Sequence, residues 1–202
     1  KLRNHIETMQ ILVSIRHSID TNDEFYDKEN EYMDEISPIL FGFTNDFYKA
    51  LVNSKFKDEL IKKYGKLLFD LAENTLKVFS NEIIPDAQEE NRLSSKYSKL
   101  IASAKIDFDG KELNLSQMVP YTQSKDRNVR IEAAKKVAQF FAENQEEFDN
   151  IYDEMVKVRT EMAHALGYEN YVDLQYKLLN RTDYNHKDVA KYREKVLKTL
   201  TP

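Results

Sequence analysis

The stretch "KIDFDGKELNL", residues 105–115, is where the hydrophobic pattern of the chain changes its period. On both sides of Asp109-Gly110, apolar residues alternate with other residues, at positions Ile106, Phe108, Leu113 and Leu115. Apolar residues at every second position are typical of a strand with one buried face. Asp-Gly favours the left-handed dihedral angles of a two-residue hairpin turn. The sequence therefore predicts one small β-hairpin near residues 100–116.

Outside this hairpin the apolar residues follow helical spacing. Residues 2–19 set the pattern, with one stripe formed by Leu2, Ile6, Met9 and Val13. Further apolar residues lie beside that stripe, so we expect this first helix to be buried on more than one side. The chain has only four glycines and four prolines, which leaves few places for turns. The expected fold class is mainly α, a multi-helix array with one hairpin.

Local signals suggest where some helices begin and bend. Thr21-x-x-Glu24 has the pattern of a capping box, which predicts a helix start there. Pro38 interrupts the helical pattern that follows, so we expect a kink or a short break at that residue. Asn170 and Asn185 are expected to cap the last two helices.

Composition and charge exclude several classes of protein. The 202 residues are 41% hydrophobic and 32% charged, as in globular proteins rather than disordered ones. The net charge is −5 and no basic run is present, so nucleic acid is not an expected partner. No apolar run approaches the roughly 20 residues of a membrane span, so no membrane partner is expected. The absence of cysteine excludes disulfides and thiolate sites and fits a cytoplasmic location.

Metal-ligating motifs are sparse in the chain. Glu161-x-x-His164 has the spacing of a ferritin-type iron ligand pair, but such a site needs two pairs and further carboxylates. The alternative interpretation places His164 in the last turn of a helix, where a cation favours the dipole. A thermolysin-type zinc site needs His-Glu-x-x-His. Glutamate follows none of the four histidines, His5, His17, His164 and His186. We therefore expect no catalytic residue and no metal ligand in this chain.

The best candidate site lies in the tyrosine-rich stretch that follows Gly167. Tyr176 and Tyr184 can each pack a ring and still offer a hydroxyl to a ligand. Arg181 can pair with Asp183 or with the carboxylate of a substrate. Two interpretations remain open for these four residues. They either hold the corner between two helices or contact a substrate.

Three stretches of the chain resemble the bacterial oligoendopeptidase F family, zinc metallopeptidases related to thimet oligopeptidase. They are "EENRLSSKYSKLIASAKIDFDGKELNLSQM" (89–118), "SKDRNVRIEAAKK" (124–136) and "KVRTEMAHALGYENYVDLQYKLLNRTDYN" (157–185). The order Leu-Gly-Tyr-Glu-Asn-Tyr and then Asn-Arg-Thr-Asp-Tyr is the most specific part. Residues 3–36 are also similar to the N-terminal helical region of that family.

This resemblance implies a helical, two-lobed cytoplasmic peptidase with a deep channel that cleaves short peptides. Its zinc is held by His-Glu-x-x-His and a later Glu, all downstream of a segment like this one. The chain would then be an N-terminal, non-catalytic portion that shapes the channel, inactive alone and without zinc of its own. Its expected partners are short peptides and the remaining catalytic part of the same protein.

The resemblance also suggests a division of the chain into three segments. Residues 1–98 would form an N-terminal helical lobe, residues 99–116 the hairpin, and residues 117–202 a second helical segment that leads toward the catalytic region. Tyr176, Arg181, Asp183 and Tyr184 are the residues expected to contact substrate. A different function remains as the alternative, a stand-alone helical module that binds a protein partner without catalysis. Self-association of the chain through exposed apolar faces is expected if it is part of a larger enzyme.

Overall fold

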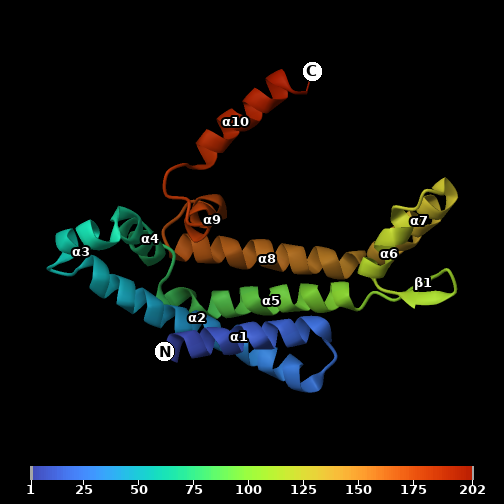
Figure 1. Ribbon diagram of the computed structural model, residues 1–202, viewed down its shortest axis with the longest axis horizontal. Helices are drawn as coiled ribbons and strands as arrows, with labels where there is room; N and C mark the ends of the chain where they lie inside the picture. Colours follow the sequence, from blue (N-terminus) through green and yellow to red (C-terminus); the bar gives the residue numbers. More distant parts are fainter. Residues whose placement is uncertain (1, 202) are drawn as a thin grey trace. The chain divides into compact units, whose positions relative to one another are not determined.

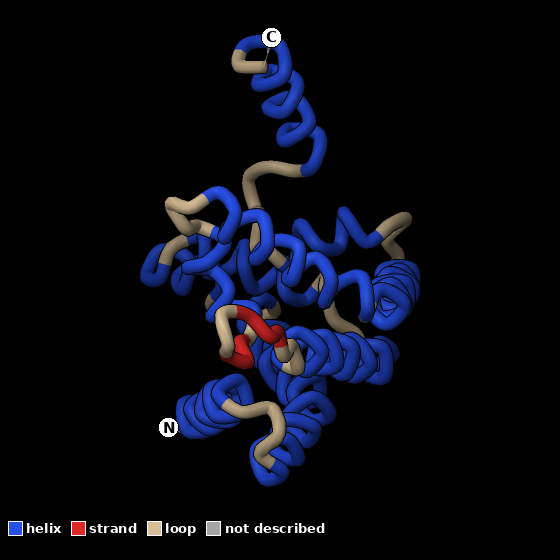
Figure 2. The backbone as a smooth tube through the Cα atoms, turned by 90° about the vertical axis from the view of Figure 1, so that its right-hand side faces the viewer, coloured by secondary structure: helices blue, strands red, loops and turns tan. Residues whose placement is uncertain are grey.

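Helices dominate the computed structural model, which describes residues 2–201 (Figure 1). In chain order the elements are α1 (Leu2–Ile19), α2 (Glu24–Val52), α3 (Lys57–Tyr64), α4 (Lys66–Leu76), the short 3₁₀ helix η1 (Asn81–Ile83), α5 (Ile84–Ala102), β1 (Ile106–Phe108), β2 (Lys111–Leu113), α6 (Leu115–Thr122), α7 (Arg127–Glu143), α8 (Gln145–Ala165), α9 (Tyr171–Leu178) and α10 (His186–Thr199). Figure 2 shows β1 and β2 as the only strands in the described part of the chain. The predicted mainly α fold with one hairpin is confirmed.

The hairpin forms at the predicted Asp-Gly turn. β1 and β2 pair in antiparallel fashion, with Ile106 opposite Leu113. Asp109 has a φ of 53° and Gly110 a φ of 70°. Both residues lie in the left-handed region, which is the geometry of a turn that matches the twist of the flanking strands. Local turn chemistry therefore sets the register, and the register turns Ile106 and Leu113 toward the same buried face.

The chain divides into two compact units that interleave along the sequence. The first contains residues 1–34 and 90–156, and the second contains residues 35–89 and 157–202. The boundaries between the units fall inside α2, α5 and α8. The predicted division into residues 1–98, 99–116 and 117–202 stays a prediction.

In the first unit, one core joins the hairpin to α6 and α7. Its buried members are Ala104, Ile106, Leu113, Met118, Ala133 and Phe140. Around this core, the ring of Phe108 lies 5.0 Å from the ring of Tyr121, edge to face. The Tyr121 hydroxyl also donates a 3.1 Å hydrogen bond to the Asp109 carboxylate in the turn. The two-stranded sheet is thus stabilised by helices, because an isolated hairpin is marginal in water.

The second unit has a core of its own around the corner between α8 and α9. Its buried members are Val78, Ile83, Met162, Ala163 and Leu174. Leu174 is completely buried on α9, as is Ala72 on α4. α9 is therefore held by packing along one face, which fixes the helix that carries Tyr176.

The first turn of α2 differs from its predicted start. Asp23 accepts hydrogen bonds from the backbone amides of Phe25 and Tyr26, at 3.0 and 3.1 Å. This carboxylate satisfies amides that the first helical turn leaves without partners. The predicted capping box of Thr21 and Glu24 does not form, because α2 begins at Glu24 and Asp23, the residue just before it, is the one that caps the helix.

α1 is less buried than its sequence predicts. Only Val13 and His17 are buried on this helix. Leu2, Leu12, Ile15 and Ile19 are 46–74% exposed, so the expectation of burial on more than one side is wrong for this chain. Leu12, Ile15 and Ile19 lie beside the central stripe and are largely exposed to solvent among residues 2–201. We call the surface formed by these three side chains the α1 apolar face.

Pro38 lies inside α2, and the helix continues through it without a break. Proline has no backbone N–H, so it cannot donate to the carbonyl of Asp34 one turn earlier. The side-chain amide of Asn91 donates to that carbonyl instead, at 2.9 Å. The next carbonyl, that of Glu35, accepts from the Gln88 amide at 2.7 Å. Of the two predicted alternatives, the break is therefore absent, because side chains from α5 donate to the carbonyl groups near the proline, and the kink stays a prediction.

A double-mutant cycle tests this role of Asn91. Asn91→Ala should lower the free energy of unfolding by about 1 kcal/mol, because a helical carbonyl loses its donor. In a Pro38→Ala background the loss should be smaller, since the new backbone N–H can donate to Asp34. Urea denaturation of the four proteins measures both losses. Gln139→Ala, an exposed amide on α7, serves as a control with equal effects in both backgrounds. Equal losses for Asn91→Ala in the two backgrounds would contradict this explanation.

The α1 apolar face predicts self-association of the chain. We expect a dimer or a larger assembly in solution, because exposed isoleucine and leucine side chains gain free energy when they are buried. Replacing Ile15 and Ile19 together by serine should raise the dissociation constant at least about tenfold. Sedimentation or light scattering across a concentration series measures this change. Lys28→Ser, an exposed polar site on α2, is the matched control.

A wild-type chain that stays monomeric at high concentration would contradict this prediction and would favour the alternative of a stand-alone helical module.

Candidate functional site

Glu161 and His164 lie at the corner between α8 and α9, where α8 ends. Gly167 has a φ of 80°, and its amide donates to the His164 carbonyl at 2.9 Å. Tyr168 donates its amide to the Ala163 carbonyl at 2.9 Å, which completes a C-terminal cap. Glu161 and His164 are both exposed, and the His164 Nε2 atom lies 3.2 Å from the carbonyl of Glu169. These contacts make the pair part of a helix end.

α9 is tied to the rest of the second unit through backbone carbonyls. Asn74 is 5% exposed, and its amide donates a 2.6 Å hydrogen bond to the carbonyl of Lys177 near the end of α9. The Tyr168 hydroxyl donates to the Lys77 carbonyl at 3.0 Å. Burial raises the pKa of Tyr168, with a smaller contribution from the charge of Asp173, so this phenol stays protonated. The hydrogen bond from Asn74 holds the end of α9, where the following loop begins.

A short loop between two capped helix ends positions the predicted substrate-binding residues. Asn180 adopts a φ of 54°, and the Arg181 amide donates to the Tyr176 carbonyl at 3.1 Å. Asn185 then starts α10 with a capping box, accepting from the amides of Lys187 and Asp188. The caps predicted at Asn170 and Asn185 are both confirmed. The loop therefore runs from a backbone hydrogen bond at Arg181 to the capping box at Asn185.

Three of the four predicted residues come together here. The Arg181 guanidinium carbon lies 4.4 Å from the ring centre of Tyr176 and 5.4 Å from that of Tyr184. The two tyrosine rings are 6.3 Å apart and nearly perpendicular. We call Tyr176, Arg181 and Tyr184 the guanidinium–tyrosine cluster. Asp183 is exposed, and the ion pairs within residues 2–201 include none between it and Arg181.

His186 flanks the cluster with a partner that the sequence did not indicate. Its Nδ1 atom lies 2.9 Å from the Asp173 carboxylate, and its ring is 6.2 Å from the ring of Tyr176. Asp173 and His186 are 13 positions apart in sequence (186 − 173) and meet because the loop after α9 brings the first residue of α10 next to α9. No local spacing could have indicated this pair.

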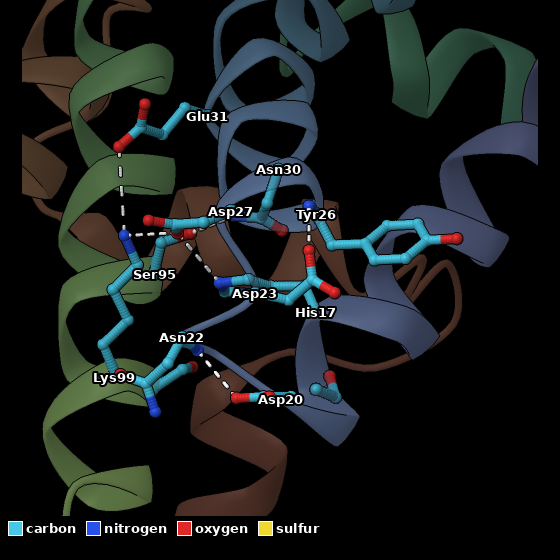
Figure 3. A network of polar contacts seen from close by, with 12 residues as sticks. His17, Asp20, Asn22, Asp23, Tyr26, Asp27, Asn30, Glu31, Ser95 and Lys99 are labelled. Atoms are coloured by element: carbon cyan, nitrogen blue, oxygen red, sulfur yellow. Dashed lines mark hydrogen bonds and ion pairs between the residues drawn. The ribbon is translucent and has the colours of Figure 1, made fainter.

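A second polar cluster, in the first unit, was missed entirely by sequence reasoning (Figure 3). His17 is 5% exposed, and its Nε2 atom lies 3.1 Å from the Asp27 carboxylate. The Lys99 ammonium contacts the same oxygen of Asp27 at 2.5 Å and lies 3.9 Å from Glu31. The hydrogen bond from Lys99 lowers the pKa of Asp27, and the contact with His17 adds to that effect. The one available signal was a histidine on the buried stripe of α1, four residues after Val13.

Asp34 occupies a different environment in the same unit. Its carboxylate accepts a 2.6 Å hydrogen bond from the Ser95 hydroxyl and a 3.3 Å bond from the Asn30 amide. Burial raises the pKa of Asp34, although the Ser95 hydrogen bond acts in the opposite direction. Asp27 is thus favoured in its ionised form by a cation, whereas Asp34 is bonded by neutral groups.

A pocket of about 420 Å³ lies next to these side chains, between α1, the start of α2 and the second half of α5. It is lined by Ser14, His17, Ser18, Thr21, Asn30, Asp34, Asn91, Ser94, Ser95, Tyr97, Ser98, Ile101 and Ala102. Hydroxyl and amide groups predominate, which suits water or a small polar molecule.

Residues 2–201 offer no group of three or more His, Cys, Asp or Glu side chains placed to hold a metal ion. In the same range, no helix combines the length and the apolar character that crossing a bilayer requires.

Comparison with known proteins supplies the family context of these features. Residues 1–79 match the family model described as the peptidase M3 N-terminal domain. No match is found among curated proteins. The chain is 51% identical to a crystal structure named as an oligoendopeptidase F from Bacillus anthracis, with a TM-score of 0.94 over 97% of this chain.

Two further solved structures are similar to the chain. One, also named as an oligoendopeptidase F, is 49% identical with a TM-score of 0.95, over 98% of this chain. The other, described as PZ peptidase A with an inhibitor, is 51% identical with a TM-score of 0.94, again over 98% of this chain. The chain spans only about a third of those solved chains, 36%, 35% and 35% of their lengths.

The ion pair of Asp27 predicts how stability depends on pH. A carboxyl with a lowered folded pKa stabilises the protein above its unfolded pKa, about 3.9, and this contribution is lost as the pH falls through the folded value. Asp27→Asn should therefore lower the free energy of unfolding by roughly 1–2 kcal/mol at pH 7. The difference from wild type should shrink below about pH 4.

Chemical denaturation at several pH values measures this difference. Asp107→Asn, at an exposed position on β1, is the control and should change stability little at any pH. An effect of Asp27→Asn that is independent of pH would exclude the ion pair as its cause.

Proposed function

Because the chain belongs to the oligoendopeptidase F-type peptidases of the M3 family, we propose that it is a non-catalytic part of a zinc-dependent oligopeptidase that hydrolyses short peptides. Its role is to shape the channel through which the peptide reaches the catalytic region. The observation that carries this proposal is the similarity along nearly the whole chain, with 49–51% identity at TM-scores of 0.94–0.95. At this identity, we expect each residue of a binding surface in the solved relatives to have a counterpart in this chain.

Catalysis is assigned to the rest of a longer protein. The solved relatives are almost three times as long as this chain, which leaves ample length for a catalytic region. None of the four histidines here begins His-Glu-x-x-His, and no three-ligand group suits zinc within residues 2–201. Zinc, when bound elsewhere in the protein, would activate a water molecule for attack on the peptide carbonyl. The residues of this chain would bind and orient the peptide.

The guanidinium–tyrosine cluster is the proposed peptide contact on this chain. Two aromatic rings offer apolar surface to a peptide side chain, and their hydroxyls offer hydrogen bonds to its backbone. Tyr184 is 44% exposed, so its ring is accessible to a ligand. Arg181 adds a permanent positive charge between these rings. Asp183 lies on the same loop and completes the set of predicted contact residues.

Kinetics of the longer peptidase, with this chain joined to the remaining region found in its relatives, test the proposal. Arg181→Ala should lower kcat/KM for short peptides about tenfold, because a charged hydrogen-bond donor to the substrate contributes about 1.5–3 kcal/mol. Tyr184→Phe should have a smaller effect of about threefold, since it removes a neutral hydroxyl. Arg193→Ala, at an exposed position on α10, is the matched control.

Two results would contradict the proposal. The first is unchanged kinetics in both Arg181→Ala and Tyr184→Phe with unchanged stability. The second is metal-dependent peptide hydrolysis by the 202-residue chain alone, because that activity would require a catalytic site within it.

A further inference from the structure

The charge of Arg181 is not neutralised by any acidic side chain nearby. Within residues 2–201, the contacts of its guanidinium are the two tyrosine rings at 4.4 and 5.4 Å. The two rings are nearly perpendicular to each other, so the guanidinium packs against both without lying parallel to both. Its N–H groups donate to no acceptor among residues 2–201, which leaves them available to a ligand.

Two acidic residues of the flanking helices, Asp173 and Asp188, are bonded to other groups. Asp173 pairs with His186 at 2.9 Å. Asp188 accepts from the Asn185 amide at 3.2 Å and from the Lys191 ammonium at 3.2 Å. These bonds to the backbone and to Lys191 lower the pKa of Asp188, which keeps it ionised at its own helix start. Asp183, two residues from Arg181, is exposed and forms no ion pair with it among residues 2–201, so the guanidinium has no carboxylate partner within this part of the chain.

The tyrosine hydroxyls add donors at the same place. Those of Tyr176 and Tyr184 make no hydrogen bond to another group among residues 2–201. A guanidinium fork without an acidic partner is a site for a planar anion with two oxygen atoms. Its geometry matches a carboxylate, which accepts two parallel N–H bonds from arginine. The net charge of the chain is −5, so general attraction does not draw anions to it and a local site is needed.

We propose that Arg181, held between the rings of Tyr176 and Tyr184, binds a carboxylate group of a short peptide. This inference rests on the proposed function, because it assigns a chemical class to the same peptide contact. The carboxylate has two sources in a peptide, the α-carboxylate at its C-terminus and an acidic side chain. A C-terminal contact would select short substrates by fixing the distance between the chain end and the cleaved bond.

Three N-acetylated pentapeptides separate these possibilities. The first is pentaalanine with a free C-terminal carboxylate, and the second is the same peptide as its C-terminal amide. The third is an amidated Ala-Ala-Glu-Ala-Ala, whose only carboxylate is on a side chain. Each is titrated into the 202-residue chain, with the arginine Nε–Hε signals followed by nuclear magnetic resonance.

The free acid should bind at least tenfold more tightly than the neutral amide and should shift the Arg181 signal. Arg181→Gln should abolish this preference, and Arg181→Lys should recover only part of it, since lysine has charge but no planar fork. Arg193→Gln should retain the full preference. Tight binding of the glutamate peptide would identify the side chain as a second source, whereas its failure would restrict the site to the C-terminus.

Several outcomes would overturn the inference. They are equal affinity for the free acid and the amide, a preference that survives Arg181→Gln, and no detectable binding of any peptide. Circular dichroism checks that the Arg181 variants fold. If Arg181→Gln fails to fold, Arg181→Lys serves as the comparison, because it keeps the charge and loses the planar fork.

A second assay separates this inference from the proposed function. The longer peptidase is tested on longer peptides with free and amidated C-termini. Equal KM for both would refute carboxylate binding and leave the peptidase function intact. Absence of any hydrolysis would refute the proposed function, while the binding preference of the 202-residue chain would still decide the carboxylate site.

Discussion

Pro38 imposes a requirement on α2 that the helix cannot meet by itself. A proline inside a helix leaves the carbonyl one turn earlier without its backbone donor, and an unpaired carbonyl away from water is unfavourable. Asn91 and Gln88 on α5 supply donors to the carbonyls of Asp34 and Glu35. With these two hydrogen bonds in place, α2 continues over 29 residues. Since α2 and α5 each contribute to both compact units, these hydrogen bonds join the helices on which each unit is built.

The same two helices bring together the polar side chains of the first unit. Asp27 and Asp34 are seven positions apart on α2, so both face α5, where Lys99 and Ser95 are their partners. Yet the two acids differ in chemistry. A lysine neutralises Asp27, whereas Asp34 is half-buried and bonded by a hydroxyl and an amide. Burial and partner choice, not residue type, therefore determine which carboxyl ionises more readily.

The guanidinium–tyrosine cluster depends on backbone geometry rather than on a helix face. Tyr176 lies on α9, whereas Arg181 and Tyr184 lie on the loop that follows. Asn180, in the left-handed region, turns the chain so that the Arg181 amide returns to the Tyr176 carbonyl. The capping box at Asn185 then limits how far the loop can extend. This arrangement leaves the arginine against two aromatic rings and without an ion pair among residues 2–201.

The amino-acid sequence by itself determined the features whose causes are local. The Asp109-Gly110 turn, the caps at Asn170 and Asn185, and the helical character of most of the chain follow from dihedral preferences and from hydrophobic period. Local reasoning also selected Tyr176, Arg181, Asp183 and Tyr184 as candidate substrate contacts, which stays a prediction. Only the tertiary structure decided how α2 tolerates Pro38, that His17 pairs with Asp27, and that Asp173 pairs with His186. Each of these depends on a side chain from another helix or from a distant position, and sequence spacing carries no information about which helices pack together.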